Sequence, residues 1–98
     1  MAGPDRRNVV VLAPILDLKA AAPLADELIA LRGTDITIDG TGVQRVGAQC
    51  LQVLLAARRA WAADRAEFAI VAASEHLQAT ATLLGTSAAL FDSAEISL

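Results

Sequence analysis

Few side chains in this 98-residue chain are suited to catalysis, and they do not form a recognisable motif. The single histidine, His76, follows Glu75 at the expected start of a helix, where a lone imidazole is usually a solvated side chain. The single cysteine, Cys50, falls on the apolar side of another expected helix, where a thiol behaves as a small hydrophobic group. A reactive cysteine would need an exposed, positively charged site with a base nearby. These residues therefore predict no catalytic centre.

Two other patterns resemble ligand sites without completing one. Residues 40–42 (Gly-Thr-Gly) lack both the third glycine of G-x-G-x-x-G and a following Lys-Ser/Thr, so neither nucleotide-binding motif is met. Asp17, Asp35 and Asp39 fall at the ends of expected strands, but their spacing selects no magnesium site, and solvated loop acids are the simpler interpretation. We therefore expect no metal, no cofactor and no enzymatic activity.

Composition narrows the functional class further. The net charge is −3 and the eight basic residues form no block, so nucleic-acid binding is not expected. Apolar runs fall far short of the roughly 20 residues that cross a bilayer, and the polar start lacks the apolar stretch of a signal peptide. We expect a cytoplasmic protein without direct membrane insertion. One cysteine excludes an internal disulfide.

Hydrophobic periodicity predicts strands that alternate with helices. The expected strands are 9–12, 15–18, 34–39 and 68–72, with a further edge strand within 91–98, and the expected helices are 20–32, 47–63 and 74–85. We expect the first two strands to form a hairpin. The order predicts a single α/β domain over 8–98, after a flexible tail at 1–7, with a mixed, mostly parallel sheet of four to five strands and about three helices.

The apolar positions of each expected helix fall on one side. Pro23 fits the first turn of the first helix, and Gly33 fits the stop after it. The residues expected to face the sheet are Leu24, Leu28 and Leu31 in the first helix, Cys50, Leu51, Leu54, Leu55, Ala57 and Trp61 in the second, and Leu77, Ala81 and Leu84 in the third. Ile96 and Leu98 would share one side of the last strand.

The junction between strand 34–39 and helix 47–63 is the expected binding region. Sites in open α/β sheets form at the carboxyl ends of strands, and the first N–H groups of a helix favour an anion or polar partner. An arginine-containing polar surface suits protein docking. The exposed residues expected to bind the partner are Thr41, Gln44, Arg45, Ala48, Gln49, Gln52 and Arg59.

The pattern over roughly 9–91 resembles the STAS domains, the family of bacterial anti-sigma-factor antagonists and related modules. Residues 14–17 (Pro-Ile-Leu-Asp) are similar to the family's G-x-L-D segment before an Ala/Leu-rich helix. Residues 35–39 (Asp-Ile-Thr-Ile-Asp), 43–46 (Val-Gln-Arg-Val) and Leu51 follow its strand-loop-helix frame, and 68–71 and 83–85 with 90–91 continue the order. The resemblance implies a STAS fold and a regulatory binding role.

The sequence departs from this family at one functional position. Switching antagonists carry a serine in a D-S-S-G stretch, which the cognate anti-sigma kinase phosphorylates. Counting back from Leu51, the equivalent acceptor position is Ala48, which has no hydroxyl. A phosphate switch at that residue is therefore excluded. Thr41 offers a hydroxyl in the preceding loop, and whether it is modified stays open.

The resemblance also implies a partner. It would be a GHKL-type kinase, either an anti-sigma kinase or a chemotaxis histidine kinase. Residues 46–55 (Val-Gly-Ala-Gln-Cys-Leu-Gln-Val-Leu-Leu) are similar to the helix of small STAS proteins from chemotaxis clusters. The alternative is a STAS subunit that braces the ATPase of a lipid-transport ABC system.

Overall fold

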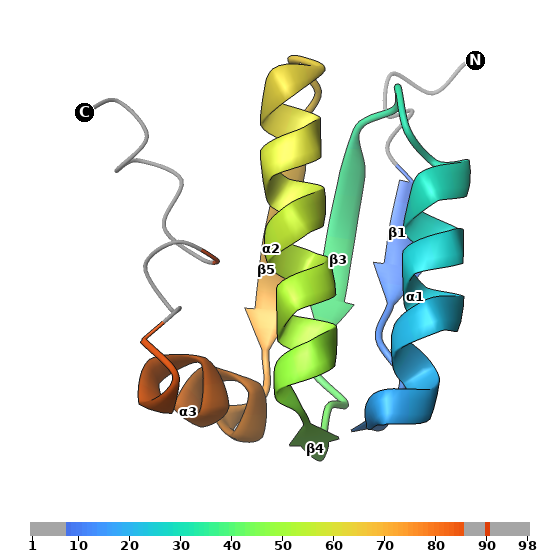
Figure 1. The fold of residues 1–98 in the computed structure, drawn as a ribbon. Coiled ribbons are helices and arrows are strands. Elements are labelled where there is room, and N and C mark those ends of the chain that lie inside the picture. Colours follow the sequence, from blue (N-terminus) through green and yellow to red (C-terminus); the bar gives the residue numbers. More distant parts are fainter. Residues whose placement is uncertain (1–7, 86–89, 91–98) are drawn as a thin grey trace.

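The computed structural model describes residues 8–85 and Leu90. Its central sheet has three parallel strands in the order β1-β3-β5, and a second, parallel pair joins β2 to β4 (Figure 1). The strands are β1 (Asn8–Val11), β2 (Ile15–Leu16), β3 (Ile36–Gly40), β4 (Arg45–Val46) and β5 (Phe68–Ala73). The helices are α1 (Leu18–Ala30), α2 (Ala48–Ala63) and α3 (Glu75–Leu83). The chain thus has the predicted α/β character.

The strand order determines which face of the sheet the helices cover. The crossovers β1-α1-β3 and β3-α2-β5 step in the same direction, and right-handed crossovers then place both helices on one face. Figure 1 shows α1 and α2 side by side in front of the strands. On the opposite face, Val9 and Val11 of β1 and Val71 of β5 are 62 %, 69 % and 64 % exposed. Among the described residues, the sheet therefore has one covered and one open face.

The core lies between the sheet and these helices. In β3, Ile36 and Ile38 are fully buried whereas Thr37 and Asp39 are half-buried, which is the alternation expected of a strand. The predicted apolar side of α2 is also confirmed, except that Leu55 is only partly buried. The indole Nε1 of Trp61 donates a 2.6 Å hydrogen bond to the carbonyl oxygen of Thr34.

Two helices begin at side-chain caps. The carboxylate of Asp17 accepts from the N–H of Ala20, so α1 begins at Leu18, before the expected start. Pro23 consequently lies inside the helix, and its predicted place in the first turn is wrong. The hydroxyl of Ser74 caps α3 at the N–H of Leu77, as its sequence position predicts.

The predicted N-terminal hairpin is wrong. β1 pairs with β3 and β2 pairs with β4, so every pairing between described strands is parallel rather than mixed. The carbonyl oxygen of Pro14 accepts from the N–H groups of Gln44 and Arg45 at 2.7 and 3.1 Å. These bonds hold the second segment against the 43–46 loop and away from β1. The second strand is also shorter than predicted, because Asp17 already caps α1.

Two burial predictions also need correction. Leu84 is 47 % exposed because α3 ends at Leu83, so only Leu77 and Ala81 bury its apolar side. Leu31 is the C-cap residue after α1 and is only partly buried. The predicted tail at 1–7 and the predicted edge strand within 91–98 lie outside the described residues.

Candidate functional site

The loop before α2 is anchored by three neighbouring segments. Its start is fixed because the N–H of Val43 donates to the carbonyl oxygen of Gly40 at 3.3 Å, and its end because the N–H of Gly47 donates to that of Leu16 at 2.9 Å. The hydroxyl of Ser74, at the start of α3, donates to the carbonyl oxygen of Val43. Val43 and Val46 are buried. The loop is therefore held by both its backbone and its apolar side chains.

Close packing beneath this loop explains its first glycine. A Cβ atom on Gly40 would lie 2.7 Å from Cδ2 of Leu77 and 3.0 Å from the carbonyl oxygen of Ala72. The carbonyl oxygen of Gly40 accepts from the N–H of Ser74 at 3.0 Å. Glycine at the end of β3 thus lets β5 and the start of α3 approach the loop closely.

All seven residues predicted to bind a partner are exposed. Anchoring of the loop turns Thr41, Gln44 and Arg45 outward beside the start of α2, where Ala48 and Gln49 also lie. In α2 itself, Gln52 follows one turn later. Arg59 is set apart from the rest, since it lies eleven positions further along the helix than Ala48, or about 16 Å. The structure therefore brings most of the predicted set to one end of α2 and leaves Arg59 towards the other.

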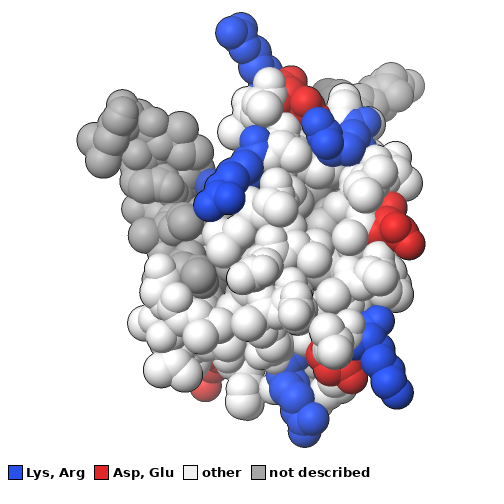
Figure 2. All heavy atoms as spheres, in the orientation of Figure 1, with Lys and Arg blue, Asp and Glu red and all other residues white. Residues whose placement is uncertain are grey.

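Charges are sparse over much of this face. Figure 2 shows that the surface over the middle of α1 and α2 is largely uncharged, with Lys and Arg side chains towards its upper and lower ends. Within the loop, the carboxylate of Asp39 accepts from the N–H of Thr41 at 3.0 Å and from its hydroxyl at 2.6 Å. These hydrogen bonds hold the pKa of Asp39 below its ordinary value.

The start of α2 has no side-chain cap. Gly47 is the N-cap residue, and the first turn contains no acidic side chain. The first N–H groups of a helix carry partial positive charge, so this end of α2 favours a polar or acidic group of a partner. Ala48, at the predicted phosphoacceptor-equivalent position, is the first residue of the helix and is exposed.

The side chains that could take part in catalysis or metal binding lie apart from one another. Cys50 is fully buried, and its thiol lies 3.4 Å from the carbonyl oxygen of Asp17. His76 is exposed on α3. In the described part of the chain, no three or more His, Cys, Asp or Glu side chains are grouped so as to hold a metal ion. No helix of that part combines the length and apolar character of a membrane span.

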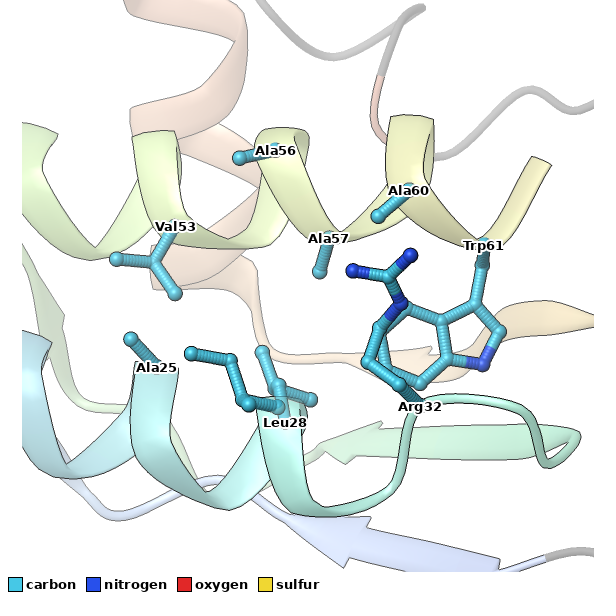
Figure 3. A pocket seen from close by; sticks show the side chains of 9 residues that line it. Ala25, Leu28, Arg32, Val53, Ala56, Ala57, Ala60 and Trp61 are labelled. Carbon is cyan, nitrogen blue, oxygen red and sulfur yellow. The ribbon is translucent and has the colours of Figure 1, made fainter. Parts of the chain in front are cut away.

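Sequence reasoning missed an apolar groove between α1 and α2. The groove has a volume of about 240 Å³ and begins along α2 at Val53, the residue after Gln52. Figure 3 shows that Arg32 closes one end, where its guanidinium carbon lies 6.0 Å from the centre of the Trp61 ring. The small residues at 53, 56, 57 and 60 recur every three or four positions, which was the available signal. The lining residues are Ala25, Leu28, Ile29, Arg32, Val53, Ala56, Ala57, Ala60 and Trp61.

A buried arginine was also missed. Arg58 is 8 % exposed, and its guanidinium lies 5.7 Å from the centre of the Phe68 ring. One nitrogen, Nη1, donates to the carbonyl oxygen of Phe68 at 3.3 Å, whereas Nε is buried without a hydrogen-bond partner. The available signal was its position, because Arg58 lies four residues after Leu54 and three before Trp61, both of which are buried.

Comparison with known proteins gave one result. A family model described as "Mlab, STAS domain" matches residues 2–91. Searches of curated proteins and of solved structures each gave no match. Because the family match covers nearly the whole chain and the fold agrees with it, this chain belongs to the STAS-domain family, whose members are generally non-enzymatic binding modules.

Proposed function

We propose that this chain is a cytoplasmic regulatory module that docks on a GHKL-type kinase of the anti-sigma or chemotaxis type. The docking surface is the loop and outer side of α2, formed by Thr41, Gln44, Arg45, Ala48, Gln49, Gln52 and Arg59. Its exposure above an anchored loop supports this proposal, because a surface already held in place loses little conformational entropy on binding. The groove between α1 and α2 extends the same side of the molecule.

The exposed, uncapped start of α2 is the observation that carries this proposal, because it leaves the first N–H groups of the helix free for a partner. Ala48 occupies the position at which the switching antagonists carry a phosphorylated serine, and it has no hydroxyl. Phosphate there would add about 1.5 to 2 negative charges at a helix N-terminus and alter docking. Without that group, docking is not switched at this residue. We infer that the regulatory input acts on the partner or on the amount of this protein.

A second candidate follows from the same alanine. A structural subunit that braces the ATPase of a lipid-transport ABC system needs constant association rather than a switch. The absence of a hydroxyl at position 48 favours such a constitutive contact. Both candidates use the surface around Arg45 and Ala48, and they differ in the partner.

Affinity purification from the native host, followed by mass spectrometry, separates the two candidates. A histidine or anti-sigma kinase that co-purifies with wild-type protein supports the first. The ATPase subunit of a membrane transporter supports the second. Neither class in the eluate, with the tagged protein folded, contradicts both.

Charge reversal at the surface tests the docking site itself. In titration calorimetry against the identified partner, Arg45→Glu and Ala48→Glu are each expected to weaken binding about tenfold or more, because both place negative charge beside the helix start. Arg65→Glu makes the same charge change as Arg45→Glu beyond the other end of α2 and is the matched control. Thermal melts establish that each variant is folded. Wild-type affinity in both surface variants would place the interface elsewhere.

A further inference from the structure

Both outer strands of the central sheet, β1 and β5, are hydrogen-bonded to β3 alone in the described part of the chain. The pairing of β5 with β3 is interrupted by a register shift between Ile38 and Asp39, whereas that of β1 is regular, so the free edge of β1 is the better suited to accept a strand. The N–H of Asn8 donates to the carbonyl oxygen of Asp35 at 3.0 Å, and that of Leu12 to Asp39 at 2.9 Å. Backbone groups alternate in direction along a strand. The N–H and C=O groups of Val9 and Val11 therefore point to the free edge.

This edge has only one of the features that protect edge strands from pairing. Proteins blunt such edges with short strands, charged side chains, proline or bulges. β1 is short, with four residues, but it reads Asn-Val-Val-Val and contains no charge, proline or bulge. Val10 is buried under the helices, whereas Val9 and Val11 are mostly exposed on the open face. Valine also has high β-propensity, so the strand is well suited to accept a neighbour.

We propose that two copies of this chain pair through β1, antiparallel and around a two-fold axis at Val10. In that register Val9 lies opposite Val11 of the second copy, and Val10 opposite Val10 of the second copy. Each outward N–H and C=O of Val9 and Val11 then has a partner. The result is one continuous sheet made from the two three-stranded sheets, with α1 and α2 of both copies on the same side.

The symmetry of the strand favours a second copy over an unrelated strand. An isologous interface must be complementary to itself, and three successive valines present the same side chains in both directions. Cross-strand pairs of β-branched residues are favourable. An apolar hollow of about 330 Å³, lined in part by Val11, Ala13 and Pro23, adjoins the end of β1 and adds contact area.

The small size of this edge makes the dimer weak. A stable interface buries roughly 1,200 to 2,000 Å², which a four-residue strand does not supply. Glu27 on α1 also lines the hollow, and symmetry brings two such carboxylates to the same side. We expect a dissociation constant on the order of 100 µM. The outer side of α2 lies away from this edge and stays open for the proposed partner.

Proline substitution distinguishes the N–H groups of β1 that point to the free edge from those that bond to β3. Sedimentation equilibrium of wild-type protein from about 10 µM to about 1 mM should show a monomer passing to a dimer. Val9→Pro removes an outward N–H and is expected to stay folded and monomeric. Val10→Pro is the matched control, because it removes an N–H that faces β3 and should unfold the domain. Wild-type protein that is still monomeric at about 1 mM overturns the proposal.

Paired charges test the antiparallel register. Val9→Lys/Val11→Lys and Val9→Glu/Val11→Glu should each be monomeric, since like charges then face one another, and a mixture of the two should form a heterodimer. Val71→Lys adds the same charge to the open face of β5, at the opposite edge of the sheet from β1, and should leave the dimer intact. A dimer lost in Val71→Lys would mean that the open faces pack together instead. A mixture that fails to associate overturns the register.

Discussion

Cys50 shows how burial controls the chemistry of a single residue. Its thiol is fully buried, and loss of solvation raises its pKa, so the reactive thiolate is scarce at neutral pH. We expect a thiol reagent such as dithionitrobenzoate to modify Cys50 in native protein at least about a hundredfold more slowly than in urea. Absorbance of the released thiolate gives both rates. Equal rates would mean that Cys50 is exposed and that α2 is rotated about its axis from the orientation described above.

At this scale, periodicity predicted burial well where side chains were apolar. Cys50, Leu54 and Trp61 recur on one side of a helix, and all three are buried. Arg58 shares this side by its spacing from Leu54 and Trp61, but it escaped prediction because arginine is rarely buried without a partner, and its partner here, the carbonyl oxygen of Phe68, belongs to the following strand. Contacts between elements, rather than within them, limit what the sequence tells about one residue.

Gly40 is the residue at which three elements meet, because it ends β3 and contacts both β5 and the start of α3. A Cβ there collides with the buried side chain of Leu77 and with the backbone oxygen of Ala72, which cannot rotate away. We expect Gly40→Ala to lower the free energy of unfolding by about 1 to 3 kcal/mol, measured by urea denaturation. Gly42→Ala is the control, because a Cβ at that position has no neighbour within 4 Å. Equal stability of both variants would contradict this packing.

A surface ion pair links the ends of α1 and α2. Nε and Nη2 of Arg32 donate to the carboxylate of Asp64 at 2.7 and 3.0 Å, which lowers the pKa of Asp64 from its ordinary 3.8. A lowered native pKa adds stability above the unfolded pKa, and this is lost as pH falls through the native value.

Asp64→Asn isolates this contribution from that of Asp39, whose pKa is also lowered. Urea denaturation of wild type and variant should show a stability difference at pH 6 that shrinks below about pH 4. Added salt should reduce the difference at pH 6, because both side chains are accessible to solvent. If the stability difference persists unchanged at low pH, its cause is packing rather than the ion pair.

The elements themselves were largely predictable, and their pairing was not. Apolar periodicity, the Ser74 cap and the β3 alternation placed the helices and main strands. The hairpin prediction failed because short consecutive strands usually pair, whereas here Pro14 bonds to Gln44 and Arg45, some 30 residues away. Local pattern reports what a segment forms, and long-range hydrogen bonds decide which segment it joins.

For the whole molecule, the sequence predicted which residues of the candidate surface are exposed, but it did not predict the shape of that surface. Helical period correctly placed Gln49, Gln52 and Arg59 on the outer side of α2. The anchoring of the loop by Ser74 joins residues 31 positions apart, and no sequence pattern indicates it. The groove beside α2 likewise exists because consecutive crossovers place α1 and α2 on one face. The partner-binding role of these residues stays a prediction.

The buried side chains form one cluster that draws on β1, α1, β3, α2 and α3, so the domain should unfold as a single unit. Trp61, the only tryptophan, is buried on α2 and reports on that region, whereas far-ultraviolet circular dichroism reports on all helices. We expect coincident urea midpoints from the two signals. Leu77→Ala, which opens a cavity under α3, should lower both midpoints equally and reduce the free energy of unfolding by about 2 to 5 kcal/mol. Leu83→Ala, at an 83 % exposed position, should change stability by no more than about 0.5 kcal/mol. If Leu77→Ala shifted the circular dichroism but left the Trp61 midpoint in place, α3 would be a separate unit, and the anchoring of the loop through Ser74 would not depend on the main core.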